Sequence, residues 1–218
     1  MELGNFEAVI FDMDGVLIDS EPLWKIAMEE VFNSVGCPLT KKDFQKTVGL
    51  RIDEVIEFWF QEIGWNKVSP KEVEGKIIHR MIELISEHGK PLKGVLETLD
   101  FLRSKNIKIG LGTSSYSVLI KAVLDTLKIA NKFDFVHSAE DEKFGKPHPA
   151  VYLTVAEKLN VTPRKCLVIE DSLNGIISAK AAQMKVVCIP EKTHTPEPKL
   201  SVADWMFEDM SQLLLSIQ

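Results

Sequence analysis

The sequence predicts an α/β fold, a doubly wound parallel sheet into which an α-helical unit is inserted. Short apolar runs alternate with helical stretches over most of the 218 residues, as buried strands and crossover helices do. From residue 20 to residue 88 this alternation stops, and apolar residues recur only at helical spacing. Because one strand precedes this region and the others follow it, we expect a helical insert at 20–88 and a core formed by 1–19 and 89–218.

The expected strands are short, mostly apolar runs that end at polar residues. They lie at 8–11, 107–111, 133–136, 166–169 and 186–189. The helices expected between them lie at 95–105, 117–127, 150–159 and 174–182, and each is long enough for one right-handed crossover. Residues 190–198, with three prolines and several charges, are expected to form a surface loop.

The clearest helix of the insert begins at Ser69. Ser69 and Glu72 have the spacing of a capping box, and Pro70 suits a first helical turn. The helix is expected to end near Gly89, with an apolar face formed by Val73, Ile77, Met81, Ile82 and Ile85. The stretches 23–35 and 52–63 are expected to cover that face, and short linkers near residues 19 and 90 indicate a hinge.

Composition and charge exclude several classes of protein. Hydrophobic residues make up 45% of the chain, enough for a sizeable core, and the net charge of −6 without a basic block argues against a nucleic-acid binder. No apolar run approaches the ~20 residues that span a bilayer, and the N-terminus lacks the features of a signal peptide, so we expect a cytoplasmic protein. Cys37, Cys166 and Cys188 form no C-x-x-C pair and are expected to be reduced core thiols.

Polar residues follow three of the expected strands. These segments are Asp12-Met13-Asp14-Gly15, Gly112-Thr113-Ser114-Ser115 and Glu170-Asp171-Ser172. In an open parallel sheet, ligands bind beyond the carboxyl ends of the strands, so these side chains should share one crevice. Several carboxylates in one crevice repel one another unless a cation lies among them, and oxygen ligands without histidine or cysteine favour Mg²⁺. The sequence therefore predicts a magnesium site.

The same residues suit phosphoryl transfer. Asp12 and Asp14 can take different parts, one attacking while the other moves protons, and Lys146 can balance the charge of a phosphate. Two alternatives stay open at this level. Thr113 could cap the following helix instead of binding phosphate, and Lys143 competes with Lys146 as an exposed loop lysine.

Four motifs together resemble the haloacid dehalogenase superfamily of phosphatases. They are D-x-D-G-V-L-x-D-S from Asp12 to Ser20, a threonine at Thr113, K-P at Lys146-Pro147, and E-D-S-x-N-G from Glu170 to Gly175. Their order and the helical insert also agree with this family. The resemblance implies a Rossmann-like core, an inserted α-helical cap domain that closes over the crevice, and a phosphoric monoester hydrolase.

The resemblance also implies a role for each site residue. Asp12 would be the nucleophile, Asp14 the general acid and base, and Thr113 and Lys146 the phosphate ligands. Mg²⁺ would be bound by Asp12, the backbone carbonyl of Asp14, Glu170 and Asp171, with Glu170 acting either directly or through a metal-bound water. Asn174 is either a residue of the helix start or a partner of the acidic pair.

Two further segments are similar to phosphatases of sugar and polyol phosphates, such as those acting on 2-deoxyglucose 6-phosphate. They are E-P-L-W, from Glu21 to Trp24, and G-L-R-I-D, from Gly49 to Asp53. The expected substrate-binding residues are Trp24, Gly49, Arg51, Ser114 and Ser115, although Trp24 could equally be core packing. The expected partner is a small phosphate ester, and a monomer is compatible with the sequence. His148 is the one histidine close to a motif.

The predicted function is hydrolysis of a small phosphomonoester, a hexose or polyol phosphate, through an aspartyl-phosphate on Asp12. A sugar-phosphate mutase of the β-phosphoglucomutase type is the main alternative, but that branch carries a cap histidine where this chain has Trp24. A hydrolytic dehalogenase would lack Asp14. A non-catalytic module that binds phosphate ligands is the alternative outside enzymes, and the intact set of acids argues against it.

Overall fold

A six-stranded, wholly parallel sheet forms the centre of the core. The computed structural model describes residues 2–40, 42–47, 50–190 and 198–218. The strands are β1 (Ala8–Phe11), β2 (Lys108–Thr113), β3 (Phe135–Ser138), β4 (Cys166–Glu170), β5 (Lys185–Cys188) and β6 (Trp205–Met206), in the order β3-β2-β1-β4-β5-β6. The connections diverge to either side of β1 and β4, and the predicted doubly wound fold is confirmed.

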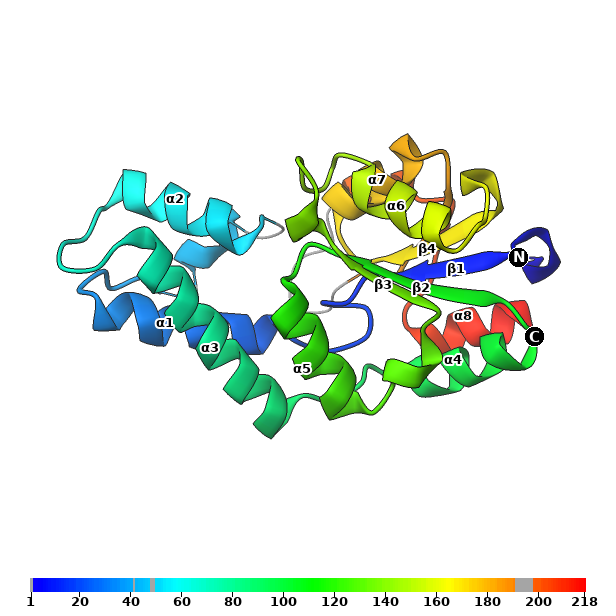
Figure 1. Ribbon diagram of the computed structural model, residues 1–218, viewed down its shortest axis with the longest axis horizontal. Helices are drawn as coiled ribbons and strands as arrows, with labels where there is room; N and C mark the ends of the chain where they lie inside the picture. The colour runs from blue at the N-terminus through cyan, green and yellow to red at the C-terminus, as the bar shows by residue number, and fades with distance from the viewer. Residues whose placement is uncertain (1, 41, 48–49, 191–197) are drawn as a thin grey trace.

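Helices cover both faces of the sheet because successive strand residues point to opposite sides (Figure 1). On one face, Val9 and Phe11 of β1 pack with α4 (Val95–Ser104), α5 (Ser117–Leu127) and α8 (Met210–Ile217). On the other face, Ala8 and Ile10 pack with α6 (Ala150–Lys158) and α7 (Leu173–Ala181). Two apolar layers therefore enclose β1, as its unbroken apolar run predicts.

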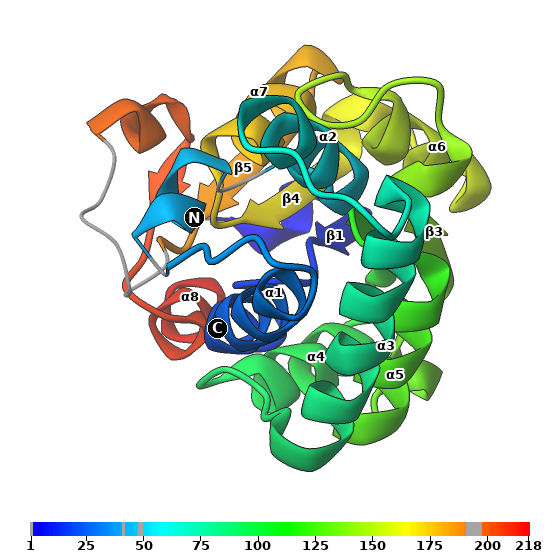
Figure 2. The ribbon, with the colours of Figure 1, turned by 90° about the vertical axis from the view of Figure 1, so that its left-hand side faces the viewer.

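Among the described residues between β1 and α4 lie three α-helices, which are here called the helical insert: α1 (Glu21–Ser34), α2 (Ile52–Glu62) and α3 (Pro70–His88). The capping box of α3 is as predicted: the Ser69 hydroxyl accepts from the Glu72 backbone N–H at 3.2 Å, and the Glu72 carboxylate accepts from the Ser69 N–H at 2.7 Å. Besides packing on α1 and α2, α3 lies along α5 of the core (Figure 1; Figure 2). The main helix–helix contact between the insert and the core is therefore the packing of α3 on α5.

The strand β6 and the helix α8 are not among the elements predicted from the sequence. The strand β6 has only two residues, which pair with Val187 and Cys188, and such a short run has no recognisable apolar pattern. In α8, Asp209 caps the helix by accepting from the Gln212 N–H, and Leu213 is buried toward the core. In the part of the chain that the structure describes, six short 3₁₀ helices complete the elements: 3–5, 43–47, 130–132, 139–141, 163–165 and 198–202.

The remaining sequence expectations about the fold have different outcomes. All three cysteines are buried free thiols, as predicted. Within the described ranges, no helix is long and apolar enough to cross a membrane. The surface loop expected at 190–198 lies largely outside the described residues, because 191–197 are not among them.

Candidate active site

The acidic residues lie together beyond the carboxyl ends of β1 and β4, as the strand order requires. Asp12 and Asp14 follow β1, and Glu170 ends β4. Gly15, between these segments, has φ +70°, and a Cβ there would lie 2.1 Å from a carboxylate oxygen of Asp171. Glycine is therefore needed both for the turn and for the close approach of the two strand ends.

Lys146 joins the acids of the two strands. Its ammonium donates to Asp12 at 2.8 Å, to Glu170 at 2.7 Å and to the carbonyl of Gly112 at 3.1 Å, which uses all three of its N–H groups. Burial opposes the charged form, but the two carboxylates prevail and raise the pKa of Lys146 above its usual value. Lys146, and not the exposed Lys143, is thus the lysine of the site.

The carboxyl of Asp12 lies in a strongly perturbed environment. Burial raises the pKa of Asp12 to about 7, with a further upward contribution from Glu170, and Lys146 offsets this only in part. A second cation close to Asp12 would favour its ionised form. A metal ion beside Asp12 would therefore balance negative charge that Lys146 alone leaves uncompensated.

Glu170 is fully buried and accepts hydrogen bonds on both oxygens. One oxygen receives Lys146 and the Tyr152 hydroxyl at 2.6 Å, and the other receives the backbone N–H groups of Asp171 and Ser172 at 3.0 and 3.1 Å. Lys146 lowers the pKa of Glu170 although burial acts in the opposite direction. A Cβ on Gly175 would lie 1.7 Å from Glu170, so α7 passes over this carboxylate only with glycine there.

The carboxylates of Asp12, Glu170 and Asp171 offer oxygens that lie within 4.8 Å of one another. Among the described residues that line the adjoining cavity there is no histidine or cysteine, so its donors are hard oxygens. These two observations fit Mg²⁺, which prefers carboxylate and water oxygens. Asp12 and Asp171, with Glu170 beside them, are the residues that would hold the ion.

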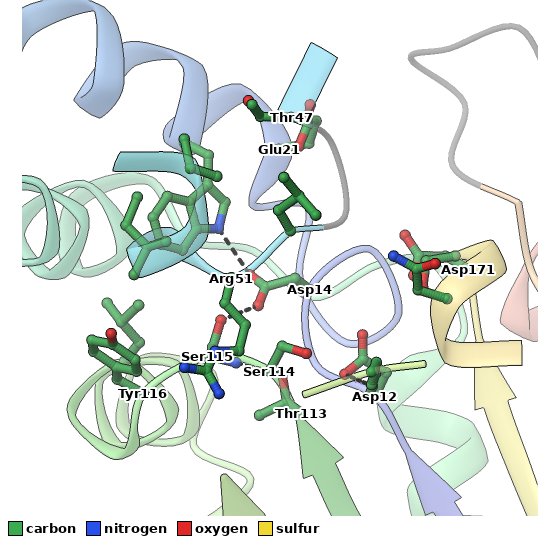
Figure 3. A pocket seen from close by; sticks show the side chains of 18 of the residues that line it. Asp12, Asp14, Glu21, Thr47, Arg51, Thr113, Ser114, Ser115, Tyr116 and Asp171 are labelled. Atoms are coloured by element: carbon green, nitrogen blue, oxygen red, sulfur yellow. Dashed lines mark hydrogen bonds and ion pairs between the residues drawn. The ribbon is translucent and has the colours of Figure 1, made fainter. Parts of the chain in front are cut away.

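Asp14 is held by donors from both the core and the helical insert (Figure 3). The Ser115 hydroxyl donates to one of its oxygens at 2.6 Å, and the Trp24 indole N–H donates to the other at 3.3 Å, beside the Ser20 hydroxyl. Trp24 therefore lies in the site rather than only in the apolar core. Ser115, predicted to bind substrate, contacts Asp14 in this structure.

The structure decides the alternative that the sequence left open for Thr113, and it also locates His148. Thr113 does not cap α5, because that helix begins at Ser117 after Tyr116 and has no side-chain cap. The Thr113 side chain is buried at the floor of the cavity and accepts from the Ser115 N–H at 3.2 Å. His148 accepts from the Ala150 N–H at the start of α6 and does not line the cavity.

The cavity lies between the strand ends and the helical insert, and Figure 3 shows groups from both sides around it. Among the predicted residues, Asp12, Asp14, Trp24, Arg51, Thr113, Ser114, Ser115, Lys146 and Asp171 line it, and Asn174 does as well. Gly49 lies outside the described residues. Sequence reasoning missed Glu21, Phe44, Thr47 and Tyr116, which also line the cavity. It also missed Tyr152, whose place in an apolar helix pattern gave no signal of a bond to Glu170.

A family model for haloacid dehalogenase-like hydrolases matches residues 9–189. The chain belongs to this family. Hexitol phosphatase B of Escherichia coli strain K12 is 38% identical over 207 residues, covering 94% of this chain and 93% of the relative. The phosphorylated carbohydrates phosphatase of Thermotoga maritima is 38% identical over 176 residues, covering 81% of each chain.

Solved structures of this hydrolase family have the same fold. β-Phosphoglucomutase from Clostridium difficile superimposes with a TM-score of 0.81 at 30% identity, covering 95% of this chain and 93% of the other. The family match and the relatives named as phosphatases show that this haloacid dehalogenase-like hydrolase is an enzyme, a phosphoric monoester hydrolase. The alternative of a non-catalytic module is therefore wrong.

Proposed function

We propose that this hydrolase is a magnesium-dependent phosphatase that acts on a hexose or polyol phosphate through an aspartyl-phosphate on Asp12. The observation that carries the proposal is the surroundings of Asp12. Its carboxylate lies 2.8 Å from the Lys146 ammonium, in a cluster of acids fit for a metal, at one end of a cavity that the helical insert lines. Similarity to hexitol phosphatase B supports the substrate class.

The proposed reaction has two steps. An Asp12 oxygen attacks phosphorus while the ester P–O bond breaks, and Asp14 protonates the leaving alkoxide. Asp14 then removes a proton from a water molecule that attacks phosphorus. The bond between phosphorus and the Asp12 oxygen breaks, which releases inorganic phosphate and regenerates the Asp12 carboxylate. Lys146 balances the charge of the phosphate, and the Thr113 hydroxyl binds one of its oxygens.

Bound Mg²⁺ would supply positive charge beside the phosphate and the attacking carboxylate. Because Glu170 already accepts hydrogen bonds from Lys146, Tyr152 and two backbone N–H groups, it would act indirectly, by orienting a metal-bound water. Asp171 is then the direct ligand from this pair.

Mutase activity is the second candidate because a β-phosphoglucomutase is among the similar structures. A mutase needs an extra group to move protons at the helical insert. Where the mutases carry a histidine, this chain has Trp24. The Trp24 indole N–H can donate a hydrogen bond but cannot accept a proton. This favours the phosphatase.

Phosphate release from hexitol, hexose and short acid phosphates, with Mg²⁺ or with a chelator, tests the proposal. We expect glucitol 6-phosphate or a related ester to be the best substrate, with activity lost in chelator and restored by Mg²⁺. Labelled phosphate should be trapped on Asp12. Full activity in chelator, a label on another residue, or conversion of glucose 1-phosphate to its 6-phosphate without release would each contradict it.

A further inference from the structure

Arg51 enters the cavity from the helical insert with its charge already matched. Its Nε donates to one carboxylate oxygen of Asp53 at 3.0 Å, and a terminal nitrogen donates to the other oxygen. The Arg51 backbone N–H donates to Glu54 at 2.9 Å, which fixes this residue at the start of α2. The two-point pair uses two of the five guanidinium N–H donors and leaves the others for a ligand.

The other charges around the cavity are mostly negative. Among its described lining residues, the cations are Lys146 and Arg51, and each contacts a carboxylate. The lining carboxylates are Asp12, Asp14, Glu21 and Asp171. Glu21 lies on α1 beside Thr47, on the side of the cavity formed by the helical insert (Figure 3), and its carboxylate pairs with Lys25 at 3.1 Å. That side therefore offers hydrogen-bonding groups without a net positive charge.

We propose that the Arg51–Asp53 pair makes this enzyme select phosphomonoesters whose remaining part is uncharged and reject those that carry a second anionic group. This inference rests on the proposed function and names the substrate class within it. Arg51 lines the cavity and keeps N–H donors for sugar and polyol hydroxyls, while Asp53, which is not among the lining residues, balances its charge. A second phosphate or carboxylate would instead lose its water without gaining an unmatched cation, because Arg51 is already paired with Asp53.

Two ligands of equal length test the proposal. Glucitol 6-phosphate and 6-phosphogluconate share one carbon skeleton and differ only at C1, a CH₂OH in the first and a carboxylate in the second. Each is measured as a competitive inhibitor of p-nitrophenyl phosphate hydrolysis. For the unmodified enzyme, we expect 6-phosphogluconate to bind at least about tenfold more weakly, since its carboxylate loses water without gaining an unmatched cation.

Asp53→Asn keeps the shape and one acceptor of the side chain but uncovers the charge of Arg51. This variant should bind 6-phosphogluconate about tenfold more tightly, with little change for glucitol 6-phosphate. Arg51→Gln should act in the opposite direction, because Asp53 is left uncovered, and should widen the ratio between the two ligands. Glu57→Gln is the matched control. It removes one negative charge from the exposed face of the same helix and should leave the ratio within about twofold.

Unchanged ratios in both Asp53→Asn and Arg51→Gln would overturn the inference, as would an equal shift in Glu57→Gln. Equal binding of the two ligands by the unmodified enzyme would do so too. Hydrolysis of glucitol 6-phosphate is measured separately. Failure of that reaction would contradict the proposed function, whereas the inhibition ratio depends only on phosphatase turnover of p-nitrophenyl phosphate and still decides the present inference.

Discussion

The two sides of the cavity hold their charges in different ways. At the strand ends, Lys146 joins residues 134 and 24 positions away in sequence, and both its own side chain and that of Glu170 are almost wholly buried. On the helical insert, Arg51 pairs with Asp53 two residues away, and their side chains stay 20% and 35% exposed. Buried ion pairs between distant parts of the chain hold charged groups in fixed positions, which suits a catalytic step. A partly exposed pair within one short segment can be altered by a single substitution, which suits substrate recognition.

Asp12→Asn tests the buried side most severely. An amide is a poor nucleophile, so we expect kcat to fall by roughly 10⁴-fold or more, whatever the substrate. Circular dichroism should show that the fold is kept, and steady-state kinetics measures the loss. Substantial remaining turnover would place the nucleophile elsewhere.

Asp14→Asn should have the next largest effect. General acid and base catalysis contributes about 10²–10⁴-fold, and we expect a loss of that size for glucitol 6-phosphate. Because p-nitrophenolate leaves without help from an acid, hydrolysis of p-nitrophenyl phosphate should lose less in its first step. Equal losses for both substrates would remove the acid role and leave only activation of water.

Arg51→Ala tests the exposed side. We expect kcat/KM for glucitol 6-phosphate to fall by about 1–3 kcal/mol, the range for a hydrogen bond from a charged group. Acetyl phosphate, which hardly reaches the helical insert, should be affected less than about twofold on the same grounds. If both substrates lost equally, Arg51 would be structural and the contrast between the two sides would be broken.

Tyr152→Phe tests the role of Glu170, because it removes the hydroxyl that donates to this carboxylate and keeps the apolar ring. Loss of such a supporting bond typically weakens metal affinity by about 10- to 100-fold, and we expect the lower end because Lys146 and two backbone N–H groups remain. The Mg²⁺ concentration for half-maximal activity measures this. An unchanged Mg²⁺ concentration for half-maximal activity would show that Glu170 does not contribute to metal binding.

The smallest effect concerns the stability that Asp53 provides. Burial alone would raise the pKa of Asp53, but its bonds to Arg51 lower it. A lowered folded-state pKa means that the contribution is complete above the unfolded pKa of ~3.9 and is lost as pH falls through the folded value. Since the pair is partly exposed, Asp53→Asn should cost less than about 1 kcal/mol at pH 7. Urea unfolding from pH 7 to 3 should show the two proteins converging at low pH.

The sequence by itself determined the sheet, the helical stretch between β1 and α4, and many of the polar residues that meet at the cavity. Apolar runs and strand-end acids are local patterns, and the parallel fold obliges the ends of β1 and β4 to meet, so the cluster of Asp12 and Asp171 follows without coordinates. Ser69 and Glu72 marked the start of α3 for the same local reason. The pattern failed for β6, where two residues are too few to form one.

Only the tertiary structure decided which further side chains contact the strand-end acids and line the cavity. Tyr152 belongs to an apolar face of α6, and its bond to Glu170, 18 residues away, depends on how that helix packs on β2 and β1. Trp24 contacts Asp14 because α1 begins beside the strand ends, and the cavity-lining places of Tyr116 and Glu21 also arise from packing. Periodicity tells which face of a helix is buried. The partner that a polar atom on that face meets is fixed by the relative position of elements distant in sequence.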